Sequence, residues 1–224
     1  MQPKLIFPII ICLIINSCQK EKSNETSPNG TAGYNCKACE YIPMCDSSVY
    51  SYYDTLGFGS STGITTDTML YKRDTLIRGL IYQEFYLTGS QSGRYFNCNN
   101  GISQFENKNE LIGGYFRSTM LDVNLPVNGT WSDTVLIPLV AGKEVHKKTI
   151  IAKGVGRIIN SLSFSDVIHV EDARCYPNST GGLIIIEVSD YYYAKGVGLI
   201  EVVTRDRVNA GIEHHRALKS YYIP

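Results

Sequence analysis

The chain has 224 residues, of which 43% are hydrophobic, and its 21 Lys and Arg side chains balance 21 Asp and Glu side chains. This neutral charge provides no field that would attract the phosphates of a nucleic acid, so a nucleic-acid partner is not expected.

The amino terminus has the order of a secretory signal. Lys4 precedes an apolar run over residues 5–15, and Asn16 and Ser17 then lead to Cys18. This order of a charge, an apolar stretch and small residues is typical of a cleaved targeting segment. The apolar run covers only about half of the ~30 Å hydrocarbon core of a bilayer, which disfavours a permanent transmembrane helix. We therefore predict a signal peptide over residues 1–17.

Residues 15–18, Ile-Asn-Ser-Cys, resemble the lipobox of bacterial lipoproteins. The resemblance implies cleavage before Cys18 and lipid attachment to its sulfur, which would tether the chain to a membrane. The alternative is an ordinary cleaved signal with an incidental cysteine. Residues 19–31 (QKEKSNETSPNGT) lack any large apolar side chain, and residues 18–33 are therefore predicted to be a disordered stalk. Gln19 is not the Asp that retains such proteins at the inner membrane, so we expect the outer membrane, facing the periplasm or the cell surface.

Residues 34–224 are predicted to form a single β-rich domain. From Val49 onward the apolar pattern has a period of two, is rich in Tyr, Thr, Val and Ile, and is interrupted by Gly and Asn clusters that are typical of turns. The predicted strands cover residues 49–54, 75–88, 94–98, 114–121, 134–140, 145–153, 165–171, 183–193 and 198–205.

Two further segments refine the fold class. Residues 183–186 (LIII) are continuously apolar, which predicts a strand covered on both faces. Residues 210–219 have the composition for one or two turns of helix. The sequence therefore predicts an all-β or mainly β fold with little helix, built as an antiparallel curved sheet or half-open barrel.

Short glycine motifs are interpreted as backbone features. The pentapeptide Ala-Lys-Gly-Val-Gly occurs at residues 152–156 and 194–198, and both copies are predicted to be bends between strands, because neither continues as a dinucleotide-binding loop. Residues 59–63 match Gly-x-Ser-x-Gly, the pattern of a hydrolase nucleophile. The β-branched residues that follow do not suit the required helix, so Ser61 is predicted to be a loop residue.

The cysteines allow two interpretations. Cys36, Cys39 and Cys45 form a Cys-x2-Cys-x5-Cys cluster, with Cys98 and Cys175 far downstream. An exported protein can form disulfides, which favours two bridges among Cys36, Cys39, Cys45 and Cys98, with Cys175 left free. The same four cysteines could instead bind zinc as thiolates, although the second Cys-x2-Cys half of such a site is missing. The sequence does not define the connectivity.

The histidines and tyrosines are weaker candidates for a site. His169 and Glu171 share a predicted strand face, where they could bind metal or move protons, although a cross-strand hydrogen bond is the commoner role. Adjacent His214 and His215 seldom share a metal. The sixteen tyrosines, with runs at 52–53, 191–193 and 221–222, could offer ring faces to sugars or to a protein, but they also fill ordinary strand faces.

Four segments resemble uncharacterised lipoproteins of Bacteroidota-type bacteria. They are residues 36–46 (CKACEYIPMCD), 95–101 (YFNCNNG), 164–170 (FSDVIHV) and 190–200 (DYYYAKGVGLI). The last segment is also similar to periplasmic half-barrel domains related to lipoprotein carriers. These relatives have no assigned activity, so the resemblance implies a fold and a location but supplies no catalytic residue.

The sequence therefore predicts a lipid-anchored binding or assembly module rather than an enzyme. It would contact the membrane through lipid on Cys18 and bind a protein, a glycan or an apolar ligand, with no cofactor and no metal. An envelope hydrolase and a purely structural envelope lipoprotein are the alternatives.

Overall fold

The computed structural model describes residues 39–43, 45–56, 61–87, 94–109, 114–137, 142–207 and 212–224. Its regular elements are twelve strands in this part of the chain: β1 (Val49–Leu56), β2 (Ser61–Ile77), β3 (Leu80–Leu87), β4 (Arg94–Asn99), β5 (Ile102–Asn109), β6 (Gly114–Asp122), β7 (Thr130–Ile137), β8 (Gly142–Ile159), β9 (Leu162–Pro177), β10 (Leu183–Ala194), β11 (Gly198–Asp206) and β12 (Ile212–Tyr222).

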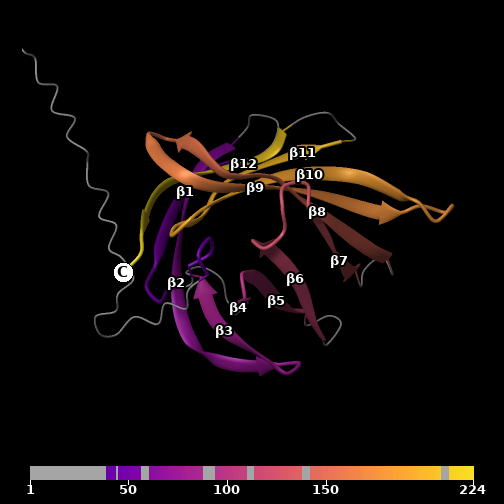
Figure 1. Ribbon diagram of the computed structural model, residues 1–224, viewed down its shortest axis with the longest axis horizontal. Helices are drawn as coiled ribbons and strands as arrows, with labels where there is room; N and C mark the ends of the chain where they lie inside the picture. The colour runs from indigo at the N-terminus through magenta and orange to yellow at the C-terminus, as the bar shows by residue number, and fades with distance from the viewer. Residues whose placement is uncertain are drawn as a thin grey trace, which may run out of the picture. The chain divides into compact units, whose positions relative to one another are not determined.

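All twelve strands belong to one antiparallel sheet, in the order β6-β5-β4-β3-β2-β1-β12-β11-β10-β9-β8-β7. Neighbours in the sheet are therefore neighbours in the chain, except where β12 returns to pair with β1. The two edge strands, β6 and β7, are themselves consecutive. Figure 1 shows the sheet curling so that β2 to β6 face the half built from β7 to β11. The predicted all-β class and the curved, half-open sheet are confirmed.

Residues 212–219, which fall in the segment predicted to contain helix, lie in strand β12, and residues 210–211 lie outside the described residues. β12 pairs with β1 from Val49↔Tyr222 to Leu56↔His214 and with β11 on its other side. Two ladders of backbone hydrogen bonds and a buried Leu218 outweigh the modest helix preference of the Ala, Glu and Lys residues. No helix among the described residues is long and apolar enough to cross a membrane.

The chain reverses direction at three two-residue hairpin turns with a left-handed backbone. Arg78–Gly79, Asn100–Gly101 and Asn160–Ser161 each have two successive positive φ angles, the geometry of two-residue hairpins. Asn-Gly is the expected sequence for such a turn, whereas Arg-Gly is not. The predicted strand over residues 75–88 was therefore wrong: the chain turns at Arg78, and its two halves end β2 and begin β3.

The two Ala-Lys-Gly-Val-Gly copies adopt different structures. The second copy forms the β10–β11 turn, as predicted. The first copy lies inside β8, where the register with β9 shifts at three successive places and Gly154 has a φ of +66°. It is therefore a bulged stretch of one long strand instead of a bend between two strands.

The main core lies on the concave face, between the two halves of the sheet. Phe85 and Leu121 from one half are completely buried with Val167, Ile168 and Ile200 from the other half. The amino-terminal residues Cys39, Tyr41 and Ile42 belong to the same cluster. The segment before β1 therefore fills part of the space that the curved sheet encloses.

Candidate functional site

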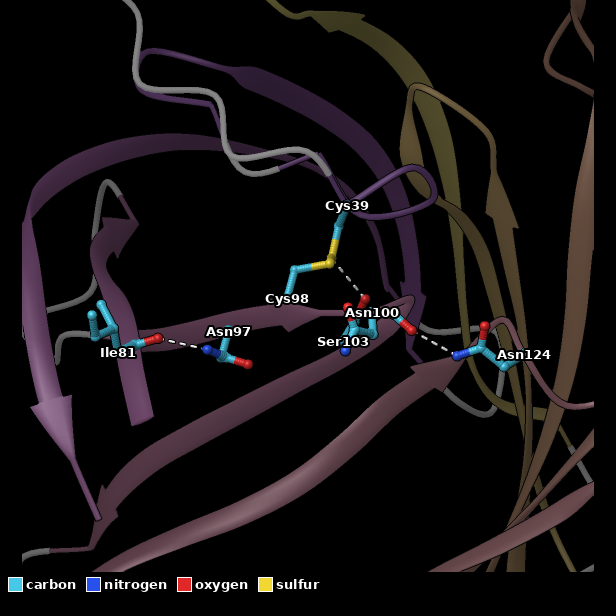
Figure 2. The surroundings of a disulfide bond; sticks show 7 residues. All are labelled: Cys39, Ile81, Asn97, Cys98, Asn100, Ser103 and Asn124. Carbon is cyan, nitrogen blue, oxygen red and sulfur yellow. Dashed lines mark hydrogen bonds between the residues drawn. A yellow bond between two sulfur atoms is a disulfide. The ribbon is translucent and has the colours of Figure 1, made fainter. Parts of the chain in front are cut away.

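A disulfide fixes the amino-terminal segment to the sheet. Cys39 is bonded to Cys98 of β4, with 5.7 Å between their Cα atoms, and the Ser103 hydroxyl lies 3.0 Å from the Cys39 sulfur (Figure 2). The disulfide alternative therefore holds for these two cysteines. Because a disulfide leaves neither sulfur as a thiolate, Cys39 and Cys98 cannot act as zinc ligands in this arrangement.

The other cysteines take separate roles. Cys45 is buried and also disulfide-bonded, and its partner lies outside the described residues. Cys175 is free and buried, and burial raises the pKa of its thiol. Cys18 and Cys36 lie outside the described residues, so lipid attachment at Cys18 stays a prediction.

The same amino-terminal segment is attached to the opposite half of the sheet. The Gly196 N–H donates to the Glu40 carbonyl at 2.6 Å, and Lys195 forms an ion pair with the Glu40 side chain. The Tyr41 hydroxyl donates to Asp166 of β9 at 2.7 Å, and burial together with that carboxylate raises the pKa of Tyr41. Residues 39–43 thus form a brace between β4 and the β9–β11 region.

A gap opens in the sheet beside this brace. β3 and β4 pair only from Gln83↔Phe96 to Phe85↔Arg94, although each strand continues to pair with its other neighbour. The strands diverge beyond Gln83, and the Asn97 amide nitrogen donates to the Ile81 carbonyl at 2.6 Å in place of the ladder. Figure 2 shows that nitrogen directed at Ile81 and the Asn97 carbonyl oxygen directed away.

The gap forms a hollow of about 410 Å³ with an uncharged lining. Asn97 and Asn99 share one face of β4 and Cys98 lies on the other, so residues from both faces line the hollow between the strands. Its lining combines amides with aliphatic and glycine residues: Gly79, Leu80, Ile81, Gln83, Asn97, Cys98 and Asn99.

A second polar site lies at the seam between the edge strands β6 and β7. The Lys148 ammonium, on β8, donates to Ser118 Oγ, to the Thr119 carbonyl and to Asp133 Oδ2, each at 2.8 Å. The Thr119 N–H donates to Asp133 Oδ2 at 3.0 Å, and the Trp131 indole N–H donates to the Thr119 carbonyl at 3.0 Å. Side chains therefore occupy the backbone groups that a ladder between β6 and β7 would have used.

The contact between Ser118 and Lys148 resembles a Ser–Lys catalytic pair, but its chemistry differs. All three ammonium protons of Lys148 have acceptors, and one of them is the Asp133 carboxylate. The Ser118 hydroxyl in turn donates to Asp133 Oδ2 at 3.0 Å, so its proton is directed at the carboxylate and not at the Lys148 nitrogen. The arrangement is suited to holding two strands together.

His146 lies next to the seam between two buried carboxylates. Its Nδ1 is 3.0 Å from Asp172 Oδ2, and its Nε2 is 2.7 Å from Glu144 Oε1. The other Glu144 oxygen, Oε2, accepts a hydrogen bond from the Tyr176 hydroxyl. Burial alone would lower the pKa of His146, but the hydrogen bonds to Asp172 and Glu144 outweigh burial and raise it. The two carboxylates lie on opposite sides of the ring, so they cannot share one metal ion with it.

The remaining predicted histidines bind carboxylates across strands. The His169 Nε2–H donates to the Asp190 carboxylate of β10 at 2.7 Å and the ring stacks on Tyr192, so the partner of His169 is not the predicted Glu171. His214 contacts Asp54 at 3.1 Å, and His215 contacts Glu201 at 2.8 Å. The last two point to different partners, as expected for neighbours on a strand, and no His, Cys, Asp and Glu group of metal-binding form occurs among the described residues.

Ser61 is the first residue of β2, not the predicted loop residue. Its side chain lies outside the described set. The strand that follows, with Thr65 paired to Tyr52, is not the helix that a hydrolase nucleophile requires. The described backbone around Ser61 thus lacks the strand-to-helix turn of that motif.

One charged row was missed by the sequence analysis. Arg73, Glu84, Tyr95, Glu106 and Arg117 lie directly opposite one another across β2 to β6. Arg73 and Arg117 each bind the neighbouring buried glutamate at 2.8 Å. The residues are spaced eleven apart in the sequence, because each hairpin returns to the same level after the same number of residues.

The comparisons with known proteins give a fold likeness at most. No protein-family model and no curated protein matches the chain. Two solved structures are similar over 83% of this chain and all of theirs: a proposed lipoprotein of Parabacteroides distasonis, 12% identical with a TM-score of 0.46, and a proposed exported protein of YmcC-like fold from Bacteroides fragilis, 6% identical with a TM-score of 0.48. Likeness at this level carries no functional argument.

Proposed function

We propose that the chain is a lipid-tethered protein of the bacterial cell envelope whose β-domain binds a neutral oligosaccharide in the gap between β3 and β4. The tether rests on the signal-like residues 1–17 and on the lipobox-like cysteine, Cys18. The outer membrane is the expected location, because the residue after the cysteine is not Asp.

The uncharged, amide-lined gap is the observation that carries the binding proposal. Each amide of Gln83, Asn97 and Asn99 offers both a donor and an acceptor, which matches the hydroxyl groups of a sugar. Leu80 and Ile81 add an aliphatic surface for the C–H face of a sugar ring. The volume of about 410 Å³ falls within the range of small-ligand sites.

The composition of the lining also distinguishes among ligand classes. A phosphate or a nucleotide would require cationic groups, and no Lys or Arg lines the gap. A lipid-like cargo would require an enclosed apolar cavity, whereas this gap is open and half polar. The proposal therefore assigns binding instead of catalysis to the domain, and a glycan instead of an apolar ligand to the site.

Calorimetric titration of the mature chain with purified neutral oligosaccharides from the bacterial envelope tests the site. We expect saturable binding that Ile81→Arg weakens at least tenfold, because the new side chain occupies the gap. Ile81 is 57% exposed, so this variant should fold normally. Asn97→Ala should weaken binding to a similar extent by removing one amide.

Ser132→Ala, on the exposed face of distant β7, is the matched control and should bind as the wild type does. If wild-type protein fails to bind any neutral envelope oligosaccharide, or if Ile81→Arg binds as tightly as wild type, the gap is not a glycan site.

Cys18→Ser tests the tether independently. The variant should lose the mass of the attached lipid and be released from membranes by a high-salt wash that leaves the wild type in place, while its binding to oligosaccharide should not change. A variant that keeps the lipid mass would contradict attachment at Cys18.

A further inference from the structure

The outer end of the β9–β10 hairpin projects beyond its neighbours. β9 and β10 pair out to Leu183↔Pro177, whereas β11 pairs with β10 only from Glu187 and β8 pairs with β9 only as far as Cys175. Figure 1 shows this turn, in orange, extending past the adjacent strands. Among the described residues, the end of the hairpin is therefore a two-stranded ribbon with no further strand paired to either side.

The projecting ribbon is apolar on both faces. Leu183, Ile184 and Ile185 are 50%, 53% and 48% exposed, and successive residues of a strand lie on opposite faces. The sequence-based prediction that this run is covered on both faces was wrong, because the strands that would have covered it end too early. Transferring these three consecutive aliphatic side chains from water to an apolar environment would be favourable.

Several polar groups at the tip of the hairpin bond to one another. Asn178 Oδ1 accepts from the Thr180 and Gly182 N–H groups and from the Thr180 hydroxyl, at 3.1, 2.7 and 2.9 Å. The Asn178 N–H donates to the Gly182 carbonyl, and the Gly181 N–H donates to the Asn178 carbonyl. Internal pairing of this kind lowers the cost of moving backbone groups out of bulk water.

At the base of the hairpin the acidic side chains are paired or buried, Asp172 and Asp206 among them, whereas several cations there are exposed. Arg174 is paired with Glu187 and Arg205 with Asp190, and Glu144 is engaged by His146 and Tyr176. Three more basic residues are exposed there and form no ion pair with a described residue: Lys143, Lys147 and Arg207. The Arg207 N–H donates to the Ile186 carbonyl, which places this cation directly beside the apolar run.

We propose that the β9–β10 hairpin inserts into the headgroup layer of an anionic membrane. Exposed aliphatic side chains, an internally bonded tip and a basic collar together match an interfacial membrane contact. The proposed lipid tether would bring this membrane within reach, so the inference extends the proposed function. The affinity of the hairpin itself does not depend on the tether.

Vesicle flotation of the full mature chain carrying Cys18→Ser, and therefore no lipid, tests the hairpin alone. The vesicles contain phosphatidylethanolamine and phosphatidylglycerol in a 3:1 ratio. We expect the protein to float with them at low salt, less at high salt, and at least tenfold less when Leu183, Ile184 and Ile185 are all replaced by Ser. Arg207→Ala should reduce flotation and its salt dependence.

The matched control replaces two exposed aliphatic residues elsewhere, Leu76→Ser and Ile158→Ser, which are 73% and 76% exposed. This control should float as the parent protein does. Equal flotation of the triple Ser variant and the parent, or no flotation of the parent, would overturn the inference. Oligosaccharide binding by the triple variant should be unchanged, which separates this outcome from a failure of the gap site.

Discussion

At the residue scale, several buried carboxylates are paired with cations on a neighbouring strand. Glu84 shows the balance: burial alone would raise its pKa, but hydrogen bonds from Arg73 and Tyr86 and the charge of Lys72 hold it below its usual value. Asp190 is similar, because burial opposes ionisation while His169 and Arg205 favour it and lower its pKa. Such pairs explain how acidic side chains are accommodated in the interior of the sheet.

His146 should make the stability of the protein depend on pH. Its pKa is raised in the folded state, so the folded protein keeps a proton that the unfolded chain releases above about pH 6.5. The stabilisation is complete below pH 6.5 and is lost as the pH rises through the folded pKa. Asp133 and Arg174 lie opposite His146 on β7 and β9, and Lys148 lies two residues along β8.

Urea denaturation of wild type and His146→Gln at pH 6 and pH 9 measures this effect. We expect the wild type to be more stable by roughly 1–2 kcal/mol at pH 6, from hydrogen bonds to charged partners, and the difference to shrink at pH 9. A difference that stays constant or grows with pH would show that the imidazolium is not the stabilising form.

The partners of these residues could not be predicted from the sequence, because they depend on register. His169 and Glu171 share a strand face, as expected, but Asp190 is brought beside His169 by the β9–β10 ladder. The eleven-residue spacing of the row from Arg73 to Arg117 was visible in the sequence. The spacing predicts that these residues lie opposite one another only when the segments between them are known to form hairpins of equal length.

At the element scale, turns that obey a known signature were predicted and the others were not. The Asn100–Gly101 turn falls in a predicted Asn- and Gly-rich break, whereas the Arg78–Gly79 turn has no such signature. The apolar run at 183–186 was interpreted correctly as a strand but wrongly as covered. Coverage depends on the lengths of neighbouring strands, which the run itself does not encode.

Two glycines with nearly the same backbone angle allow a controlled test of turn packing. Gly101 and Gly79 have φ values of +79° and +81°, but a Cβ on Gly101 would come within 2.6 Å of Val123, whereas nothing lies within 4 Å at Gly79. Asn124 also donates to the Asn100 carbonyl at 2.7 Å, which holds the linker after β6 against this turn (Figure 2).

Gly79→Ala should therefore cost about 1 kcal/mol of unfolding free energy, from the left-handed backbone alone. Gly101→Ala should cost at least ~1 kcal/mol more, because Val123 must move. Thermal or urea unfolding of both variants gives the comparison. Equal losses would mean that the contact between the β4–β5 turn and the linker contributes nothing.

At the scale of the whole molecule, the sheet is a meander that lacks one pairing. Every strand pairs with its sequence neighbour except β6 with β7, and β12 closes on β1. The curved all-β class could be predicted from the period-two pattern. The unclosed seam could not, because it depends on a few side chains that replace the backbone ladder there.

Lys148→Met should destabilise the protein by roughly 3 kcal/mol, because the Asp133 carboxylate, whose side chain is only 13% exposed, would lose its counter-charge. Lys147→Met is the matched control: Lys147 is exposed, so the change should cost less than about 0.5 kcal/mol. Adding Asp133→Asn to Lys148→Met should recover part of the loss. Similar stabilities of the Lys148→Met and Lys147→Met proteins would contradict a role for Lys148 in holding the seam.

The amino-terminal brace links the proposed tether to the proposed binding gap. The predicted stalk precedes Cys39 in the sequence, Cys39 is bonded to Cys98, and Cys98 itself lines the gap between β3 and β4. Binding in the gap would therefore occur close to the point where the tether enters the domain. Hydrogen–deuterium exchange of the mature chain, with and without neutral envelope oligosaccharide, tests this account most directly. We predict ligand-dependent protection of the amides in residues 80–83 and 97–99, whereas protection confined to other strands, or none at all, would contradict it.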